Sequence, residues 1–199
     1  MKKLFTVFFL TIVLLTTLTY NSNAQFKNRG TIEVGGTISY TSVTAVSNGT
    51  TDNNSSSMFN FTPMLSYFVV DGFYLGVSPG INIVKVAGSD NPVTNLMLFA
   101  VPGYAFGKGD VFPFVEGWLG YSALNSDGVS FEGTSSGKLE LSGLSYGARG
   151  GVKLQVGKGG LVNMGLSYIA YTFNAKGADK RTGMNTLAFV IGFSVFFGK

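Results

Sequence analysis

The sequence predicts an all-β fold: an eight-stranded antiparallel up-and-down transmembrane β-barrel. Eight stretches alternate apolar and polar residues for about ten positions or more, the length that a tilted strand needs to cross a membrane. The connections between these stretches are alternately long and short. Only 12% of the residues are charged and 14% are aromatic, so a solvated exterior is difficult to build from this chain.

The first 24 residues have the features of a secretory signal peptide. Lys2 and Lys3 precede an apolar run from Leu4 to Leu15, and Ser22-Asn23-Ala24 supplies the small residues that a signal peptidase needs. The alternative interpretation of this segment is a transmembrane anchor, but the apolar run is shorter than the roughly 20 residues that an anchor needs. Residues 25–199 are expected to form one barrel domain, which has no cysteine to form a disulfide.

The first four strands are expected at Thr31–Val46, Phe59–Val69, Phe73–Val86 and Leu96–Phe106. In each strand, bulky apolar residues alternate with small or polar ones. These apolar residues include Ile32, Val34, Ile38, Tyr40, Phe59, Phe61, Leu65, Tyr67, Phe73, Leu75, Val77, Ile81, Leu96, Leu98 and Tyr104. Asp71-Gly72 supplies a tight hairpin turn after the second strand, and Gly107-Lys108-Gly109-Asp110 turns the chain after the fourth.

The last four strands are expected at Val111–Leu124, Gly143–Val156, Leu161–Asn174 and Met184–Phe197. In the fifth the alternation is weaker, because both faces carry aromatic residues. The alternation of apolar and polar residues is clearest in the eighth strand. Its outward residues would be Leu187, Phe189, Ile191, Phe193, Val195 and Phe197, and its inward residues Thr186, Ala188, Gly192 and Ser194.

The connections indicate the orientation of the barrel. Long polar loops are expected after the odd-numbered strands, at Ser47–Ser57, Ala87–Pro92, Asn125–Gly137 and Asn174–Gly183. Outer-membrane barrels have short periplasmic turns, longer extracellular loops and an even strand number that leaves both termini in the periplasm. A bilayer offers no water to unpaired backbone groups, so the sheet is expected to close on itself.

The main competing fold is a soluble eight-stranded barrel that turns its apolar face inward. The polar faces are mostly Gly, Ser, Thr, Ala and Asn, which suit a crowded interior, whereas a water-facing surface would carry many Lys and Glu residues. Aromatic residues near strand ends also fit the girdles that meet lipid headgroups. They are Tyr40, Tyr67, Phe73, Tyr104, Phe106 and Phe197.

The mature chain resembles the small eight-stranded outer-membrane β-barrels of the OmpA/OmpX type. The segments that carry the resemblance are residues 113–121 (PFVEGWLGY), residues 144–152 (LSYGARGGV) and the aromatic final strand. The resemblance implies that the last strand carries a signal for the barrel-assembly machinery, here Phe193, Val195 and Phe197. Gly198-Lys199 follow that signal and depart from the usual aromatic end.

Four charged residues fall on the inward faces: Glu33, Glu116, Arg149 and Lys153. Ionisable residues inside a membrane segment are functional candidates, and opposite charges at similar depth can neutralise one another. Glu33 and Lys153 are expected near the periplasmic end, with Glu116 and Arg149 deeper. The favoured interpretation is a set of structural ion pairs that hold the barrel closed; the alternative is a gate that opens a narrow ion path.

Composition argues against an enzyme. The chain has no histidine and no cysteine, which excludes a Ser-His-Asp triad, a His-ligated metal and a thiolate nucleophile. The enzymes known on similar small barrels resemble one another in using histidine. Gly133–Lys138 has three residues where a phosphate loop needs four before Gly-Lys, and Leu139 replaces its Ser or Thr. No cofactor, metal or catalytic residue is expected.

Two functions stay open. As a scaffold, the barrel would present its outer loops to an extracellular partner. As a narrow channel, it would pass ions or small solutes, although an eight-stranded lumen is just wide enough for side chains to fill. Expected partners are outer-membrane lipid, including lipopolysaccharide, and the assembly machinery. The weak positive charge does not indicate nucleic acid, and a monomer is expected.

Overall fold

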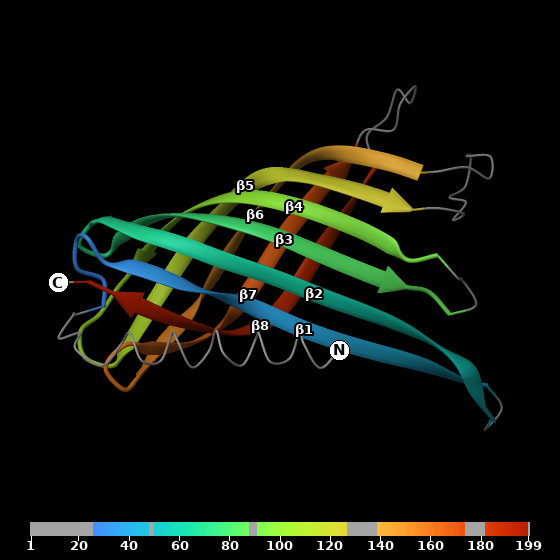
Figure 1. Cartoon of the computed structure of the whole chain (residues 1–199), viewed down its shortest axis with the longest axis horizontal. Helices are drawn as coiled ribbons and strands as arrows, with labels where there is room; N and C mark the ends of the chain where they lie inside the picture. The colour runs from blue at the N-terminus through green and yellow to red at the C-terminus, as the bar shows by residue number, and fades with distance from the viewer. Residues whose placement is uncertain (1–25, 48–49, 88–90, 127–138, 174–181, 199) are drawn as a thin grey trace, which may run out of the picture.

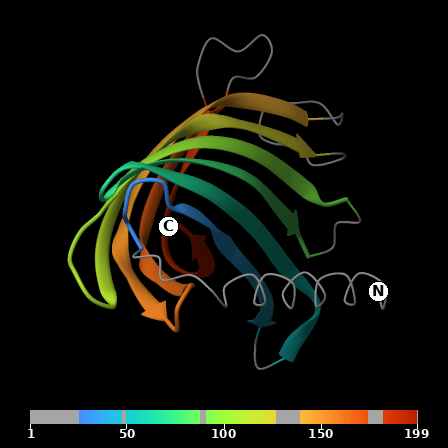
Figure 2. The same ribbon diagram turned by 60° about the vertical axis from the view of Figure 1, so that its left-hand side comes forward.

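The computed structural model describes residues 26–47, 50–87, 91–126, 139–173 and 182–198. Within these residues, eight antiparallel strands form one closed barrel in sequence order (Figure 1). The strands are β1 (Ile32–Ser47), β2 (Thr50–Val70), β3 (Phe73–Lys85), β4 (Val93–Ala105), β5 (Val111–Ser126), β6 (Leu139–Val156), β7 (Gly160–Phe173) and β8 (Thr182–Phe197). They curve around a common axis (Figure 2). The predicted fold class and strand order are confirmed. The predicted signal peptide lies outside the described residues.

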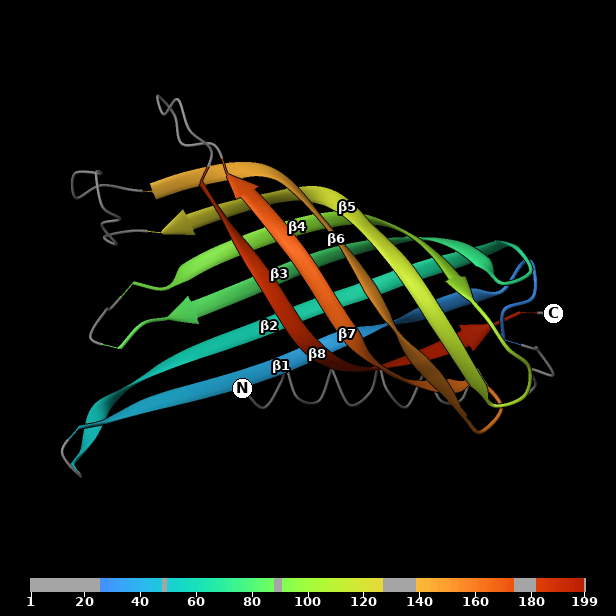
Figure 3. The same ribbon diagram turned by 180° about the vertical axis from the view of Figure 1, so that it is seen from behind.

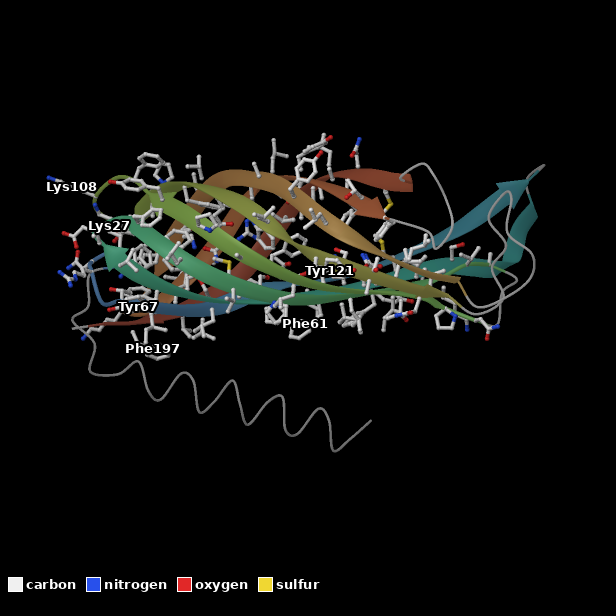
Figure 4. The ribbon with its side chains drawn as sticks, turned by 90° about the horizontal axis from the view of Figure 1, so that it is seen from above. Lys27, Phe61, Tyr67, Lys108, Tyr121 and Phe197 are labelled. Atoms are coloured by element: carbon white, nitrogen blue, oxygen red, sulfur yellow. The ribbon has the colours of Figure 1, made fainter. Side chains whose placement is uncertain are left out.

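The outward faces predicted from the alternation are exposed. Leu98, Leu119 and Leu187 are 60%, 59% and 74% exposed, and their neighbours along the strands are buried or half-buried. Every strand contributes large apolar residues to this surface, and Figure 4 shows Phe61 and Tyr121 along it. A continuous apolar surface of this kind faces lipid. In the described part of the chain, no helix is long and apolar enough to cross a membrane.

Short turns and the C-terminus share one end of the barrel (Figure 1). Gly72 and Gly107 adopt φ angles of 82° and 86° there, which glycine reaches without the strain that a Cβ would cause. The Gly72 N–H donates a hydrogen bond of 2.8 Å to the Lys27 carbonyl, and the Gly30 N–H donates one of 2.8 Å to the Phe68 carbonyl. The segment before β1 is therefore fastened to the β2–β3 turn. Tyr67 and Phe197 lie near this end (Figure 4).

The prediction of a loop over Ser47–Ser57 is wrong. β1 continues to Ser47 and β2 begins at Thr50, with Val46 paired to Thr51 and Ser42 paired to Ser57. The backbone ladder persists where the alternation of apolar and polar residues has ended, because a strand beyond the bilayer needs no apolar face. The predicted loops Asn125–Gly137 and Asn174–Gly183 lie largely outside the described residues, and so does half of Ala87–Pro92, whose described residues belong to no strand.

The interior of the barrel contains more aromatic side chains than the strand alternation predicted. Phe26, Phe68, Phe112 and Phe196 are all buried, and the Phe26 ring lies 5.0–5.3 Å from each of the other three ring centroids. Phe26 precedes β1, so the strand alternation did not reveal its position. This group, named here the aromatic plug, fills the end of the lumen that carries the C-terminus.

The seam between β1 and β8 is short. Pairing runs from Ile32 opposite Phe197 to Gly36 opposite Phe193 and covers five positions, whereas β7 and β8 pair over fourteen. Beyond Gly36 the two strands diverge toward the opposite end of the barrel (Figure 3). The barrel is closed by this short ladder, and not along the full length of the strands.

Candidate functional site

The first pair in the lumen joins neighbouring strands. Glu116 on β5 and Arg149 on β6 are directly opposite in the register, and both occupy inward positions of their strands. Arg149 Nη2 lies 2.6 Å from Glu116 Oε2, and Arg149 Nε donates to the same oxygen at 2.7 Å. Cross-strand neighbours on one face lie close enough for side chains to interact, so the local register alone brings these charges together.

The second pair crosses the lumen. Lys153 on β6 donates from Nζ to both carboxylate oxygens of Glu33 on β1, each at 2.7 Å. These strands are not neighbours in the barrel. Ser194 on β8 adds a hydrogen bond of 2.7 Å to Glu33 Oε1, and Asn163 on β7 donates to Ser194 at 3.0 Å. The four predicted residues therefore meet as two ion pairs, named here the charge layer.

Aromatic side chains enclose the charge layer. The Tyr74 hydroxyl donates to Glu116 Oε1 at 2.6 Å, and Trp118 Nε1 donates to Glu116 Oε2 at 3.2 Å. The Arg149 guanidinium lies 5.0 Å from the Trp118 ring, and Lys153 Nζ lies 5.2 Å from both the Tyr74 and Phe114 rings. Such cation–π contacts add to the ion pairs because ring faces attract cations.

The charge layer leaves almost no free volume. The cavity beside Glu33, Arg149 and Lys153 measures about 10 Å³, which is room for about one water molecule. Every oxygen of the two carboxylates accepts at least one hydrogen bond. A free carboxylate that could act as a base is therefore not present in this layer. In the described part of the chain no group of His, Cys, Asp or Glu could hold a metal ion.

Sequence reasoning missed three partners of the charge layer: Tyr74, Trp118 and Ser194. Ser194 was assigned to an inward face of the last strand, but its contact with Glu33 was not predicted. The alternation places a residue on a face but does not say which strands meet across the lumen, because that depends on the stagger of the strands around the barrel.

The predicted assembly residues lie at the seam. Val195 pairs with Val34 and Phe197 with Ile32, and Phe193 is opposite Gly36, where the pairing ends. Phe193 is 68% exposed and faces outward. The three residues thus belong to the ladder that closes the barrel.

The comparisons with known proteins identify the fold. No protein-family model and no curated protein matches the chain. Its structure is similar to Neisserial surface protein A, with 12% identity, a TM-score of 0.57, and coverage of 83% of this chain and 95% of that one. It is also similar to OprG from Pseudomonas aeruginosa (14% identity, TM-score 0.49, 86% and 98% covered) and to outer membrane protein W from E. coli (18%, 0.48, 86% and 99%).

The closed barrel of eight antiparallel strands, together with the similarity to Neisserial surface protein A, shows that the fold of this chain is that of the small eight-stranded outer-membrane β-barrels. At such identities the similarity concerns the fold alone. Function has to be argued from the residues of this chain.

Proposed function

We propose that the chain is a non-enzymatic protein of the bacterial outer membrane, whose closed barrel is a scaffold that presents its outer loops at the cell surface. The observation that supports this proposal is the charge layer, where the cavity beside the ion pairs measures about 10 Å³ and has room for about one water molecule. The absence of histidine and cysteine supports a role without catalysis. The alternative, a narrow channel, would require both ion pairs to separate.

The β1–β2 hairpin is the part of the scaffold best suited to contact a partner. β2 has 21 residues, whereas a tilted strand crosses a bilayer with about 9–11, so roughly ten residues extend beyond the membrane. An extended hairpin is a more rigid support for a binding surface than a loop, because a ladder of backbone hydrogen bonds orders it. Its partner is proposed to be an extracellular surface or ligand.

The proposal also includes the export of the chain and its assembly in the outer membrane. Residues 1–24 would be removed as a signal peptide, so the mature protein should begin at Gln25, which N-terminal sequencing of the membrane form tests. Phe193, Val195 and Phe197 would be read by the barrel-assembly machinery. Lipopolysaccharide would surround the outer half of a monomeric barrel.

Protease access on intact cells tests the proposal directly. A specific cleavage sequence inserted between residues 48 and 49, which connect β1 to β2 in the sequence, should be cut when protease is added outside. The matched control carries the same insertion in the turn at residues 107–110 and should stay intact until the cells are opened. Protection of the hairpin insertion in a correctly folded barrel would contradict surface presentation.

A further inference from the structure

The pairing between β1 and β8 ends at an unusual backbone position of β1. Gly36, the last residue of β1 that pairs with β8, has a φ angle of 144°, a conformation that L side chains rarely adopt. A Cβ at this position would collide with the Thr62 carbonyl oxygen on β2. Pro63, which faces Gly36 on β2, has no N–H to donate to the ladder. β1 leaves β8 at a point that only glycine can occupy without strain.

A cavity of about 630 Å³ lies where the two strands have separated. Its inner wall includes Asn60, Asn82 and Asn95, from β2, β3 and β4. Ile38 and Phe189 also line it, and these outward residues of β1 and β8 are 60% and 65% exposed. Because residues of the lipid-facing surface form part of its lining, the cavity opens sideways toward the membrane through the seam.

The lining restricts the chemistry of an occupant. Among the described residues that form it there is no charged side chain, and apolar residues such as Met58, Val84 and Leu124 make up much of it. An ionised group would therefore be buried without a partner, at high cost. Volumes of about 300–1,000 Å³ are typical of sites for small organic ligands. The cavity thus suits an uncharged molecule with a substantial apolar part.

One polar atom in the wall has an unmet hydrogen-bonding capacity. Asn95 is only 7% exposed, and its buried Oδ1 accepts no hydrogen bond from the described residues. Buried oxygens of this kind are normally paired. Asn95 stands on β4, across the lumen from the seam, so a strand added to the open edges of β1 or β8 would not reach it. Asn95 lines the cavity, so a rotation of its side chain would present this oxygen to a hydroxyl group at the inner end of a ligand.

We propose that this seam cavity binds a neutral, hydroxyl-bearing lipid that enters sideways from the outer half of the bilayer. The apolar chain lies between β1 and β8, and the hydroxyl donates a hydrogen bond to Asn95 Oδ1. The charge layer forms the floor of the lumen on the side of the C-terminus, so the ligand is held and is not passed through the barrel.

Photolabelling in proteoliposomes tests this proposal, with a 12-carbon alcohol that carries a diazirine on its chain as the probe. Labelled peptides should come from the cavity wall around Asn82, Asn95 and Thr186. Excess dodecanol should compete with the probe, whereas dodecane and dodecanoate should compete far less, because the first lacks the hydroxyl and the second is charged.

Two variants sharpen the test. Asn95→Leu keeps the size of the side chain and removes the acceptor, and should weaken competition by dodecanol about tenfold. Ala188→Phe fills the cavity from β8 and should abolish the specific label. The matched control, Ala148→Phe, makes the same change on the exposed outer face of β6 and should leave labelling unchanged.

Three outcomes would overturn the proposal. Labelling spread evenly over lipid-facing residues such as Leu98 and Leu166, without competition, would mean ordinary contact with the bilayer. Equal competition by dodecane, or no effect of Asn95→Leu in a folded barrel, would remove the hydroxyl contact. Crosslinks between two copies through β1 or β8 would show that a second chain covers the seam.

Discussion

Glu33 and Lys153 form an ion pair across the lumen although 120 residues separate them in the sequence. Their side chains are 4% and 2% exposed. Glu33 lies on β1 at the seam, and Lys153 lies on β6, which is not adjacent to β1 in the barrel. The pair therefore connects the seam to a distant part of the wall, whereas Glu116 and Arg149 connect two strands that are already hydrogen-bonded.

Lys153→Met should destabilise the barrel by about 3–5 kcal/mol, because the Glu33 carboxylate stays buried without its cation. Urea unfolding in lipid vesicles measures the loss. The double variant Glu33→Leu with Lys153→Met should recover most of it, since no charge is then buried. Lys108→Met, at an exposed turn, is the control and should have little effect. Equal losses for Lys108→Met and Lys153→Met would contradict the buried pair.

Arg149→Ala should destabilise the barrel by a similar amount, about 3–5 kcal/mol, because Glu116 loses its cation. The Arg149→Ala substitution should also change the tryptophan fluorescence of the protein. Trp118 is the only tryptophan of the chain, and its ring lies 5.0 Å from the Arg149 guanidinium. Water that enters the space left by Arg149 should shift the emission to longer wavelength. Arg29→Ala, with an exposed side chain, should change neither property; unchanged unfolding of Arg149→Ala would count against the pairing.

The sequence was sufficient to predict the strands, their outward faces and the inward position of the four charged residues. Inside a bilayer the two faces of a strand meet very different surroundings, so the alternation is strict and readable. The extension of β1 and β2 was not predictable in the same way, because water solvates both faces of a hairpin beyond the membrane. Phe26 was missed because it belongs to no strand.

Phe26→Ala should cost about 3–5 kcal/mol of unfolding free energy, because it empties the centre of the aromatic plug. Phe26 is 1% exposed and contacts Phe68, Phe112 and Phe196. Phe106→Ala, on the outer surface at 45% exposure, is the matched control and should cost less. Should both variants unfold at the same urea concentration, the segment before β1 does not plug the lumen.

Phe197→Ala should lower the amount of folded protein in the outer membrane of growing cells several-fold, if the assembly machinery reads the end of β8. Refolding of the purified variant into lipid should change much less, because the machinery plays no part there. Phe189→Ala, elsewhere on the outer face of β8, is the control. A similar drop for both variants in cells would assign the effect to lost lipid contact and not to a signal.

Conductance of the refolded protein in planar bilayers tests the central claim most directly. The charge layer and the aromatic plug together should leave the wild-type barrel without unitary current steps, under conditions in which protease protection confirms that it is inserted. Reproducible steps whose frequency rises with the amount of wild-type protein would contradict a closed lumen and favour the narrow channel.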